Sequence, residues 1–156
     1  MTYLVVATEA ELELPWAMAY ETLPRIITGV GGTNVIRALK NLPSDTEIIN
    51  VGYCGSACYP VGSAHHIGDC RLWHPGVTFD EPSFRLSELS KTICFTAGDF
   101  VEGDVDLPGK AVVDMELAYI CAFGFKVRAI KYVSDNLSQE DYKKNTIWQG
   151  KITSSR

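Results

Sequence analysis

The stretch Ala111-Val112-Val113-Asp114-Met115-Glu116-Leu117-Ala118 joins a short β-branched run to an almost wholly apolar segment, for which we predict a helix over Met115–Phe123. A second junction follows where the apolar run Val127–Val133, a predicted strand, meets Ser134-Asp135-Asn136. Nearly continuous hydrophobic strands beside apolar helices are typical of an α/β sheet covered on both faces. The two junctions therefore predict an α/β fold with carboxylates where two of its strands end.

The same alternation extends outward along the chain. Further strands are predicted from β-branched and apolar runs at Tyr3–Ala7, Arg25–Thr28, Glu47–Val51, Cys70–Trp73, Thr92–Phe95 and Ala111–Val113. Apolar residues at helical spacing predict a helix over Thr33–Leu42, and a more polar helix is predicted over Ser138–Trp148. Residues 74–90, with their prolines, serines and acids, are predicted to be irregular. A chain of this length accommodates one domain, which we expect to span residues 1–156.

Composition and charge exclude several classes of function. The 156 residues are 46% hydrophobic, enough to build a core, and 14 basic against 19 acidic side chains give a net charge of −5. Because there is no basic surplus to neutralise phosphates, we expect no nucleic-acid partner. No apolar run reaches the about 18 residues of a membrane-spanning helix, so no membrane partner is expected. Five cysteines behind an N-terminus that lacks a leader pattern indicate reduced thiols and a cytoplasmic protein.

Two segments contain residue types that occur in cofactor or metal sites, but the spacing of these residues favours neither kind of site. The glycine-rich turn Gly29-Val30-Gly31-Gly32 follows a strand and opens a helix, but it matches no dinucleotide or phosphate-loop pattern, so no cofactor is expected. Potential zinc ligands gather in one segment: Cys54, Cys58, His65, His66, Cys70 and His74. Their spacing does not fit the usual structural zinc sites, and we expect no metal; His65 and His66 are interpreted as loop residues.

Three carboxylates stand where strands end or helices begin. Glu11 follows the first strand, where it can reach back to the amide of Thr8 in a capping box or act as a general base on water. Glu116 lies at the start of an apolar helix, where the helix dipole stabilises it, yet a buried carboxylate there is costly unless something polar meets it. Asp135 follows a long strand, and the sequence Ser134-Asp135-Asn136 in this position is most often a turn or a helix cap.

Together, seven motifs in collinear order resemble the purine nucleoside phosphorylase/methylthioadenosine–S-adenosylhomocysteine nucleosidase superfamily. The motifs are TEAELE (8–13), ITGVGGTNVIRAL (27–39), IINVGYCGS (48–56), IGDC (67–70), FTAGDFV (95–101), VVDMELAYI (112–120) and KYVSDN (131–136). The pair VVDMELA and YVSDN at this separation is the specific part of the resemblance. It implies a three-layer α/β/α sandwich around a central mixed sheet, as in nucleoside phosphorylases.

The resemblance also implies an enzyme that hydrolyses the N-glycosidic bond of a 5′-modified purine nucleoside such as methylthioadenosine or adenosylhomocysteine. Asp135 is expected to protonate the purine and Glu11 to deprotonate the attacking water. Glu116 is expected to bind the ribose hydroxyls, Met115 to pack beside the sugar, and Phe100 to stack on the base. Carboxylates around an oxocarbenium-like centre are a coherent arrangement for this chemistry.

Two further substrate-binding residues come from the same resemblance, Tyr53 in the loop that meets the ribose and Asp114 beside the Met-Glu pair. Asn50 stands where hexameric phosphorylases have an arginine, so the nucleosidase branch and water as the nucleophile are favoured. The chain is a shortened member, since only about 26 residues separate Asp69 from Thr96 where relatives carry a longer segment. The family implies a homodimer. The alternatives are a futalosine hydrolase-like enzyme, a nucleoside phosphorylase, or a nucleoside-binding module without turnover.

Overall fold

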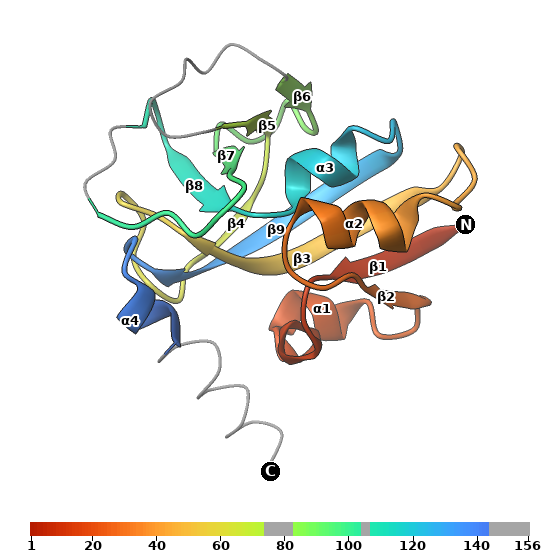
Figure 1. Cartoon of the computed structure of the whole chain (residues 1–156), viewed down its shortest axis with the longest axis horizontal. Coiled ribbons are helices and arrows are strands. Elements are labelled where there is room, and N and C mark those ends of the chain that lie inside the picture. Colours follow the sequence, from red (N-terminus) through yellow and green to blue (C-terminus); the bar gives the residue numbers. More distant parts are fainter. Residues whose placement is uncertain (74–82, 104–106, 144–156) are drawn as a thin grey trace.

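The computed structural model describes residues 1–73, 83–103 and 107–143. Its strands are β1 (Thr2–Val6), β2 (Arg25–Ile27), β3 (Glu47–Gly55), β4 (Ala64–His66), β5 (Asp69–Leu72), β6 (Ser83–Arg85), β7 (Ile93–Thr96), β8 (Ala111–Asp114) and β9 (Lys126–Asp135). Its helices are the 3-10 helix η1 (Glu9–Glu13) and the α-helices α1 (Pro15–Ala19), α2 (Gly32–Leu39), α3 (Leu117–Cys121) and α4 (Gln139–Lys143). All these strands join in one mixed sheet (Figure 1).

The long strand β3 organises the sheet. β9 runs parallel to it along one edge, from the pair Glu47 and Lys126 to the pair Gly55 and Asp135. The other edge is shared by two shorter strands: β1 pairs in parallel with its first half, and β8 pairs antiparallel with its end at Gly55. The carboxyl end of β1 and the carboxyl end of β8 therefore face each other along the same edge of β3. The cavity described below lies in the gap between these two ends.

Helices cover both faces of the sheet, which gives three layers (Figure 1). On one face, α2 and α3 bury Val35, Leu39 and Leu117 in the largest apolar cluster, against residues of β1, β3 and β9. On the other face, residues of η1 and α1 pack on a second cluster that includes Leu4 and Val51. The three-layer α/β/α sandwich with a mixed central sheet, expected from the motifs, is confirmed.

Seven of the strands were predicted, although two of them are longer than expected. β3 continues to Gly55 and β9 continues to Asp135. β4 and β6 were not predicted: His65 and His66, interpreted as loop residues, lie in β4, and β6 lies within the segment 74–90 that was predicted to be irregular. Both strands have only three residues and alternate exposed with half-buried positions, so they carry no apolar run that a sequence pattern could detect.

The helix predictions need three corrections. The helix expected over Thr33–Leu42 begins at Gly32 and ends at Leu39. The helix expected over Met115–Phe123 begins at Leu117 and ends at Cys121, which makes Glu116 its N-cap residue rather than part of its first turn. The helix expected over Ser138–Trp148 is present as α4, Gln139–Lys143, and its remaining residues lie outside the described part of the chain. The longest helix among the described residues, α2, has eight residues, and no described helix is long and apolar enough to cross a membrane.

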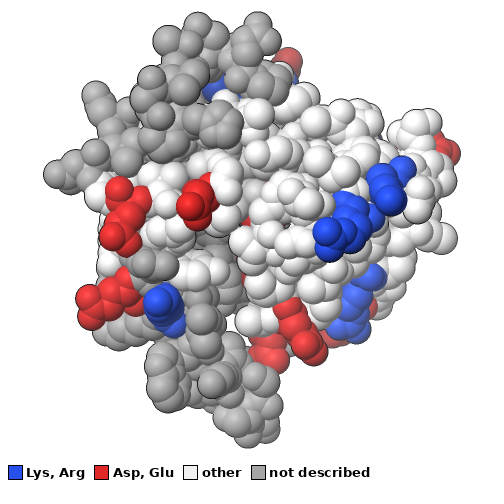
Figure 2. Space-filling view, in the orientation of Figure 1, with Lys and Arg blue, Asp and Glu red and all other residues white. Residues whose placement is uncertain are grey.

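Charged side chains are distributed without a dominant basic region on the face shown in Figure 2. Among the described residues of this face, Lys and Arg side chains are interrupted by acidic and uncharged ones, and no continuous basic surface crosses it. This distribution agrees with the net charge of −5.

Candidate active site

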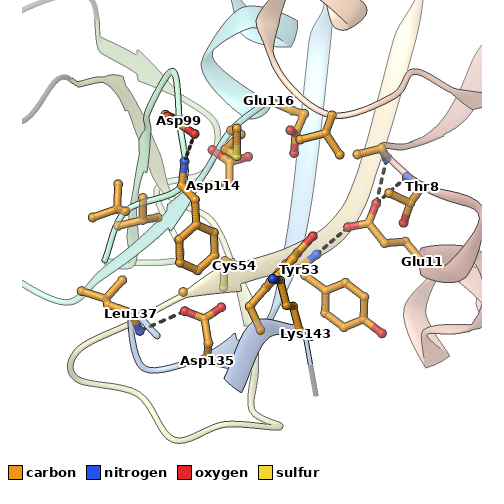
Figure 3. A pocket seen from close by; sticks show the side chains of 18 residues that line it. Thr8, Glu11, Tyr53, Cys54, Asp99, Asp114, Glu116, Asp135, Leu137 and Lys143 are labelled. Carbon is orange, nitrogen blue, oxygen red and sulfur yellow. Dashed lines mark hydrogen bonds between the residues drawn. The ribbon is translucent and has the colours of Figure 1, made fainter. Parts of the chain in front are cut away.

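A cavity of about 230 Å³ opens between the carboxyl ends of β1, β3, β8 and β9. All seven residues predicted from the sequence line it: Glu11, Tyr53, Phe100, Asp114, Met115, Glu116 and Asp135. Ligands of α/β proteins bind beyond the carboxyl ends of the strands, so the cavity is in the expected place. Figure 3 shows Glu116, Glu11 and Asp135 approaching one opening from three different sides.

Glu11 is held by backbone amides of the two residues that follow β1 and of one residue in β3. Its Oε1 accepts hydrogen bonds from the amides of Ala7 (2.8 Å) and Thr8 (3.0 Å), and its Oε2 accepts one from the amide of Tyr53 (2.7 Å). The bond from Thr8 confirms the capping interaction expected from the sequence, here on a 3-10 helix. Burial raises the pKa of Glu11, and the charge of Lys131 together with the three amides opposes that rise. Glu11 therefore both caps the helix η1 and lines the cavity.

A glycine makes room for this carboxylate. A Cβ atom at Gly52 would lie 2.7 Å from Glu11 Oε2 and 3.4 Å from the Nζ of Lys131. The first distance is shorter than real Cβ contacts allow, so a side chain at position 52 would displace the carboxylate. Gly55 does the same for Asp135, because a Cβ there would lie 2.8 Å from its Oδ1. The glycines of IINVGYCG thus allow two acids to approach the backbone of β3 closely.

Glu116 meets the glycine-rich turn. Its Oε2 accepts a hydrogen bond from the amide of Gly31 (2.8 Å), the residue that precedes α2 and has φ of 90°. The group that meets this glycine-rich turn is thus a carboxyl group of the protein itself. Burial, and next the neighbouring charge of Asp114, raise the pKa of Glu116 to about 8. A pKa of about 8 favours the protonated form of this carboxyl group at neutral pH.

Asp114 is bound on all sides by the protein. Its Oδ1 accepts the hydroxyl of Thr96, and its Oδ2 accepts the amide of Leu117 (2.8 Å) and lies 2.9 Å from Lys131 Nζ. Burial acts to raise the pKa of Asp114, but Lys131 and these hydrogen bonds outweigh it and hold the pKa below its ordinary value. For Lys131, burial acts to lower the pKa, and the charge of Asp114 outweighs it, so its pKa lies above the ordinary value. The two side chains form a buried ion pair beneath the cavity.

Asp135 ends β9 and is almost fully buried. Its Oδ1 accepts the amide of Leu137 (2.9 Å), and its Oδ2 accepts the hydroxyl of Ser134 (2.8 Å). Leu137 has φ of 65°, a left-handed conformation that is unfavourable for a leucine, and its amide points back at the carboxylate. The motif therefore forms a turn at the end of β9, and its carboxylate lines the cavity.

The remaining lining residues are aromatic, apolar or exposed. Phe100 packs against Tyr142 of α4, with ring centroids 5.3 Å apart. Tyr53 is half-buried, and burial followed by the charge of Glu11 raises its pKa to about 12. Met115 lies next to Glu116 on the cavity wall. The cavity thus combines carboxylates on three sides with an aromatic wall, a surface suited to a polar ring and a flat heterocycle.

The possible zinc ligands do not converge within the described residues. Cys54 and Cys70 are buried in the core, where burial holds their pKa values well above the ordinary one. The ring of His65 stacks on Tyr59 at 3.7 Å, and Cys58 lies beside the hydroxyl of Ser56. Among residues 1–73, 83–103 and 107–143, no group of three or more His, Cys, Asp or Glu side chains is placed to hold a metal ion, and His74 lies outside these ranges.

The sequence analysis did not predict that Lys131 and Thr96 bind Asp114 beneath the cavity. Residues Val127, Ala129, Lys131 and Val133 alternate along β9 and share one face, and the three apolar ones belong to the main core cluster. A lysine on such a face is rarely buried without a carboxylate partner, so the pattern in VRAIKYV contained a signal for the pair with Asp114. For Thr96 no such signal exists, because a threonine at the end of a strand is ordinary.

The sheet and the helices on its two faces have the architecture of a nucleoside phosphorylase-like fold. Among solved structures, the chain is similar to the MTAN of Chlamydia trachomatis, with TM-score 0.74, 17% identity, and 99% of this chain and 97% of that chain covered. It is also similar to the 5′-methylthioadenosine/S-adenosylhomocysteine nucleosidase of Streptococcus pneumoniae (TM-score 0.69, 17% identity, 99% and 95% covered) and to the S-adenosylhomocysteine nucleosidase of Streptococcus pyogenes (0.69, 15%, 99% and 92%).

These likenesses extend over the whole chain and confirm the fold of the purine nucleoside phosphorylase/methylthioadenosine nucleosidase superfamily. No protein-family model matches the sequence, and no curated protein matches it. At these identities the likeness speaks for the fold, and the activity has to be argued from the site.

Proposed function

We propose that this chain hydrolyses the N-glycosidic bond of a purine nucleoside. The observation that carries the proposal is that Glu11, Glu116 and Asp135, far apart in the sequence, line one cavity. Solved structures with this fold have been obtained with nucleoside-type ligands, among them the Chlamydia trachomatis nucleosidase with MTA and the Streptococcus pneumoniae nucleosidase with a transition-state inhibitor. These ligands support a nucleoside as the occupant of the cavity here.

The leaving group needs a proton. When the bond between C1′ of the ribose and N9 of the purine breaks, its electron pair stays with the base, and Asp135 delivers a proton to N7 so that the base leaves as a neutral molecule. The hydrogen bonds from Ser134 and Leu137 fix this carboxyl group against the end of β9. Phe100 supplies a face on which the purine stacks.

The nucleophile needs a base on the other side of the sugar. Glu11 Oε2 accepts a single described amide hydrogen bond, so a lone pair of this oxygen remains for a water molecule. The water oxygen bonds to C1′ while its proton passes to Glu11, whose pKa burial has raised. Glu11 and Asp135 lie beside Gly52 and Gly55, which are three residues apart and hence roughly 10 Å apart along an extended strand. That spacing leaves room for a ribose and a water between base and acid.

The ribose is held by Glu116, which the amide of Gly31 orients toward the cavity. A carboxyl group so placed exchanges two hydrogen bonds with the 2′- and 3′-hydroxyls. We assign Asp114, a predicted substrate-binding residue, a positioning role instead, because each of its oxygens is already bonded to protein atoms. It stabilises the N-terminal end of α3, on which Glu116 lies.

Water is favoured over phosphate by the charges around the site. Lys131, the buried cation nearest to Glu11, is paired with Asp114. Asn50, which stands where hexameric phosphorylases have an arginine, is buried within β3, bonded to the carbonyl of Val5 (3.0 Å), and does not line the cavity. A phosphate dianion in this cavity would lack, at position 50, the cation that could hold it in bidentate fashion.

Release of free base from a panel of purine nucleosides, measured with and without phosphate, tests the proposal. We expect adenine from at least one 5′-substituted adenosine without phosphate, and release slowed by about 10²–10⁴-fold in the Glu11→Gln variant. Glu13→Gln, a change of the same type in the same short helix at a residue outside the cavity lining, serves as the matched control. Binding without release identifies a nucleoside-binding module, and release only with phosphate identifies a phosphorylase.

A further inference from the structure

The central sheet has an open edge at β2. This strand is the outermost one beyond β1, and Figure 1 shows it at the margin of the sheet beside α1. The amide of Thr28 donates to the carbonyl of Val6 at 2.9 Å. Because the backbone groups of successive residues alternate between the two edges of a strand, those of Arg25 and Ile27 face away from β1. Within the described part of the chain β1 is the only strand that pairs with β2, so these amides and carbonyls are open to a partner.

An apolar groove lies beside this edge, on the face of the sheet that η1 and α1 cover. It has a volume of about 420 Å³, and its apolar lining comes from β1, η1, α1 and the segment before β2: Leu4, Leu12, Ala17, Met18 and Leu23. Arg25 also lines the groove, and Ile27 lies two residues further along the same face of β2. Met18 is 54% exposed and Ile27 is 46% exposed. The groove and the strand edge therefore form one surface, on which apolar area is open to water.

The charges at this surface are mainly negative. Glu9, Glu13 and Glu21 line the groove, and among its described lining residues Arg25 alone is basic. Across residues 1–73, 83–103 and 107–143, none of these four side chains forms a salt bridge. A segment that carries Lys or Arg beside an apolar residue complements such a surface. A second copy of this chain does not, since it would bring the same three glutamates to the edge and a further net charge of −5.

We propose that β2 and this groove bind an extended segment of a partner protein that carries basic residues on both sides of an apolar one. The segment adds a strand to the sheet, and its backbone bonds to the amides and carbonyls of Arg25 and Ile27. Side chains two residues apart in a strand point to the same face, so the apolar one enters the groove and its basic neighbours reach the glutamates. This interaction is independent of the proposed hydrolysis.

The dimensions of the surface limit the strength of the interaction. β2 has only three residues, so the backbone pairing is short and the side chains supply the selectivity. Glu9 and Glu21 are exposed, so salt screens their charges. A short peptide buries far less area than a standard protein interface, and we expect a Kd on the order of 100 µM that weakens several-fold as the salt concentration rises.

The test titrates the full chain with the acetylated and amidated peptide Thr-Lys-Thr-Ile-Thr-Lys-Thr and measures binding by calorimetry. A matched peptide with Glu in place of both Lys residues should bind about tenfold more weakly or not at all. N-methylation of alternate peptide amides tests strand addition, because only one of the two alternate sets faces β2. One N-methylated set should abolish binding, and the other should leave it within a few-fold. Absence of binding, equal binding of the basic and acidic peptides, or equal effects of the two sets overturns the inference.

Variants of the chain locate the peptide on this surface. Ile27→Pro removes an amide that faces the open edge, a position where edge strands tolerate proline, and should abolish binding, whereas Ile27→Val should retain it. Glu9→Gln combined with Glu21→Gln should weaken binding about tenfold. Glu88→Gln, at an exposed glutamate outside the groove lining, is the matched control and should leave binding unchanged. Undiminished binding to Ile27→Pro and to the double variant places the peptide elsewhere and overturns the inference.

Sedimentation of the chain without peptide tests the competing occupant, a second copy. We expect the unaltered protein and Ile27→Pro to sediment alike, because the like charges of two grooves repel each other. Self-association that Ile27→Pro abolishes would show that a second copy covers β2, and that result overturns the inference.

Discussion

Lys131 Nζ lies 2.9 Å from Asp114 Oδ2, and the two side chains are 1% and 0% exposed. The charge of Lys131 also acts on Glu11 and Glu116, the acids on either side of the gap between β1 and β8. The charge of Lys131 thus partly offsets the rise in pKa that burial causes in these acids. Without it, fewer of the carboxylates needed for chemistry would be ionised at neutral pH.

The first prediction concerns the stability of this pair. Asp114→Asn or Lys131→Met leaves one buried charge without its partner, and each change should lower the free energy of unfolding by about 3–5 kcal/mol. The double variant should be less destabilised than the sum of the two, since no charge is then left alone. Urea unfolding of all four proteins measures these differences. Additive effects of the two changes would show that the charges do not stabilise each other.

The second prediction is a pH dependence of stability that Glu116 causes. Its pKa is raised from 4.5 to about 8 in the folded protein, so between these values the folded state retains a proton that the unfolded chain releases. The free energy of unfolding should therefore fall as the pH rises from 4.5 to 8, by at most about 1.4 kcal/mol per pH unit for one proton.

Glu116→Gln removes this titration and should flatten the dependence, which denaturant unfolding at several pH values measures. Some slope should remain, because burial also raises the pKa of Glu11. Glu21→Gln, at an exposed glutamate, should leave the slope unchanged. A slope in Glu116→Gln as steep as in the unaltered protein would show that Glu116 is ionised in the folded state.

The sequence predicted the residues that line the cavity better than it predicted the ends of the neighbouring strands and helices. Glu11, Glu116 and Asp135 were each found at the end of a strand, where local patterns are clear. Only the family resemblance implied that the three acids converge. Their convergence depends on the antiparallel pairing of β8 with the last residue of β3, and such a long-range pairing has no local sequence pattern. The three-residue strand β4 was missed for the same reason, since it is held by pairing with β9.

The third prediction concerns the glycine next to the proposed base. Gly52→Ala places a Cβ 2.7 Å from Glu11 Oε2, so the carboxylate must move away from the cavity or β3 must shift. A displacement of about 1 Å in a catalytic group costs on the order of a hundredfold in rate, and kcat/KM should fall by that amount.

A double variant separates this cause from general damage to the sheet. If the alanine acts by displacing Glu11, adding Gly52→Ala to Glu11→Gln should lower kcat/KM by much less than a hundredfold. Losses in kcat/KM that are fully additive in the double variant would place the effect of Gly52 elsewhere in β3.

The fourth prediction separates binding from turnover at Asp135. Asp135→Asn has nearly the same shape and can still accept the hydrogen bond from the amide of Leu137, so the end of β9 and the cavity should persist. An amide does not deliver a proton to the purine, and kcat should fall by roughly 10²–10⁴ while the affinity for the nucleoside stays within a few-fold.

Ser134→Ala provides the comparison, because it removes one hydrogen bond to Asp135 and leaves the carboxyl group in place. Its loss in kcat should be far smaller than that of Asp135→Asn, and stopped-flow release of adenine together with equilibrium binding measures both quantities. If Asp135→Asn instead weakens binding and leaves kcat unchanged, Asp135 holds the base without protonating it. The leaving purine must then take its proton from water or from another group in the cavity.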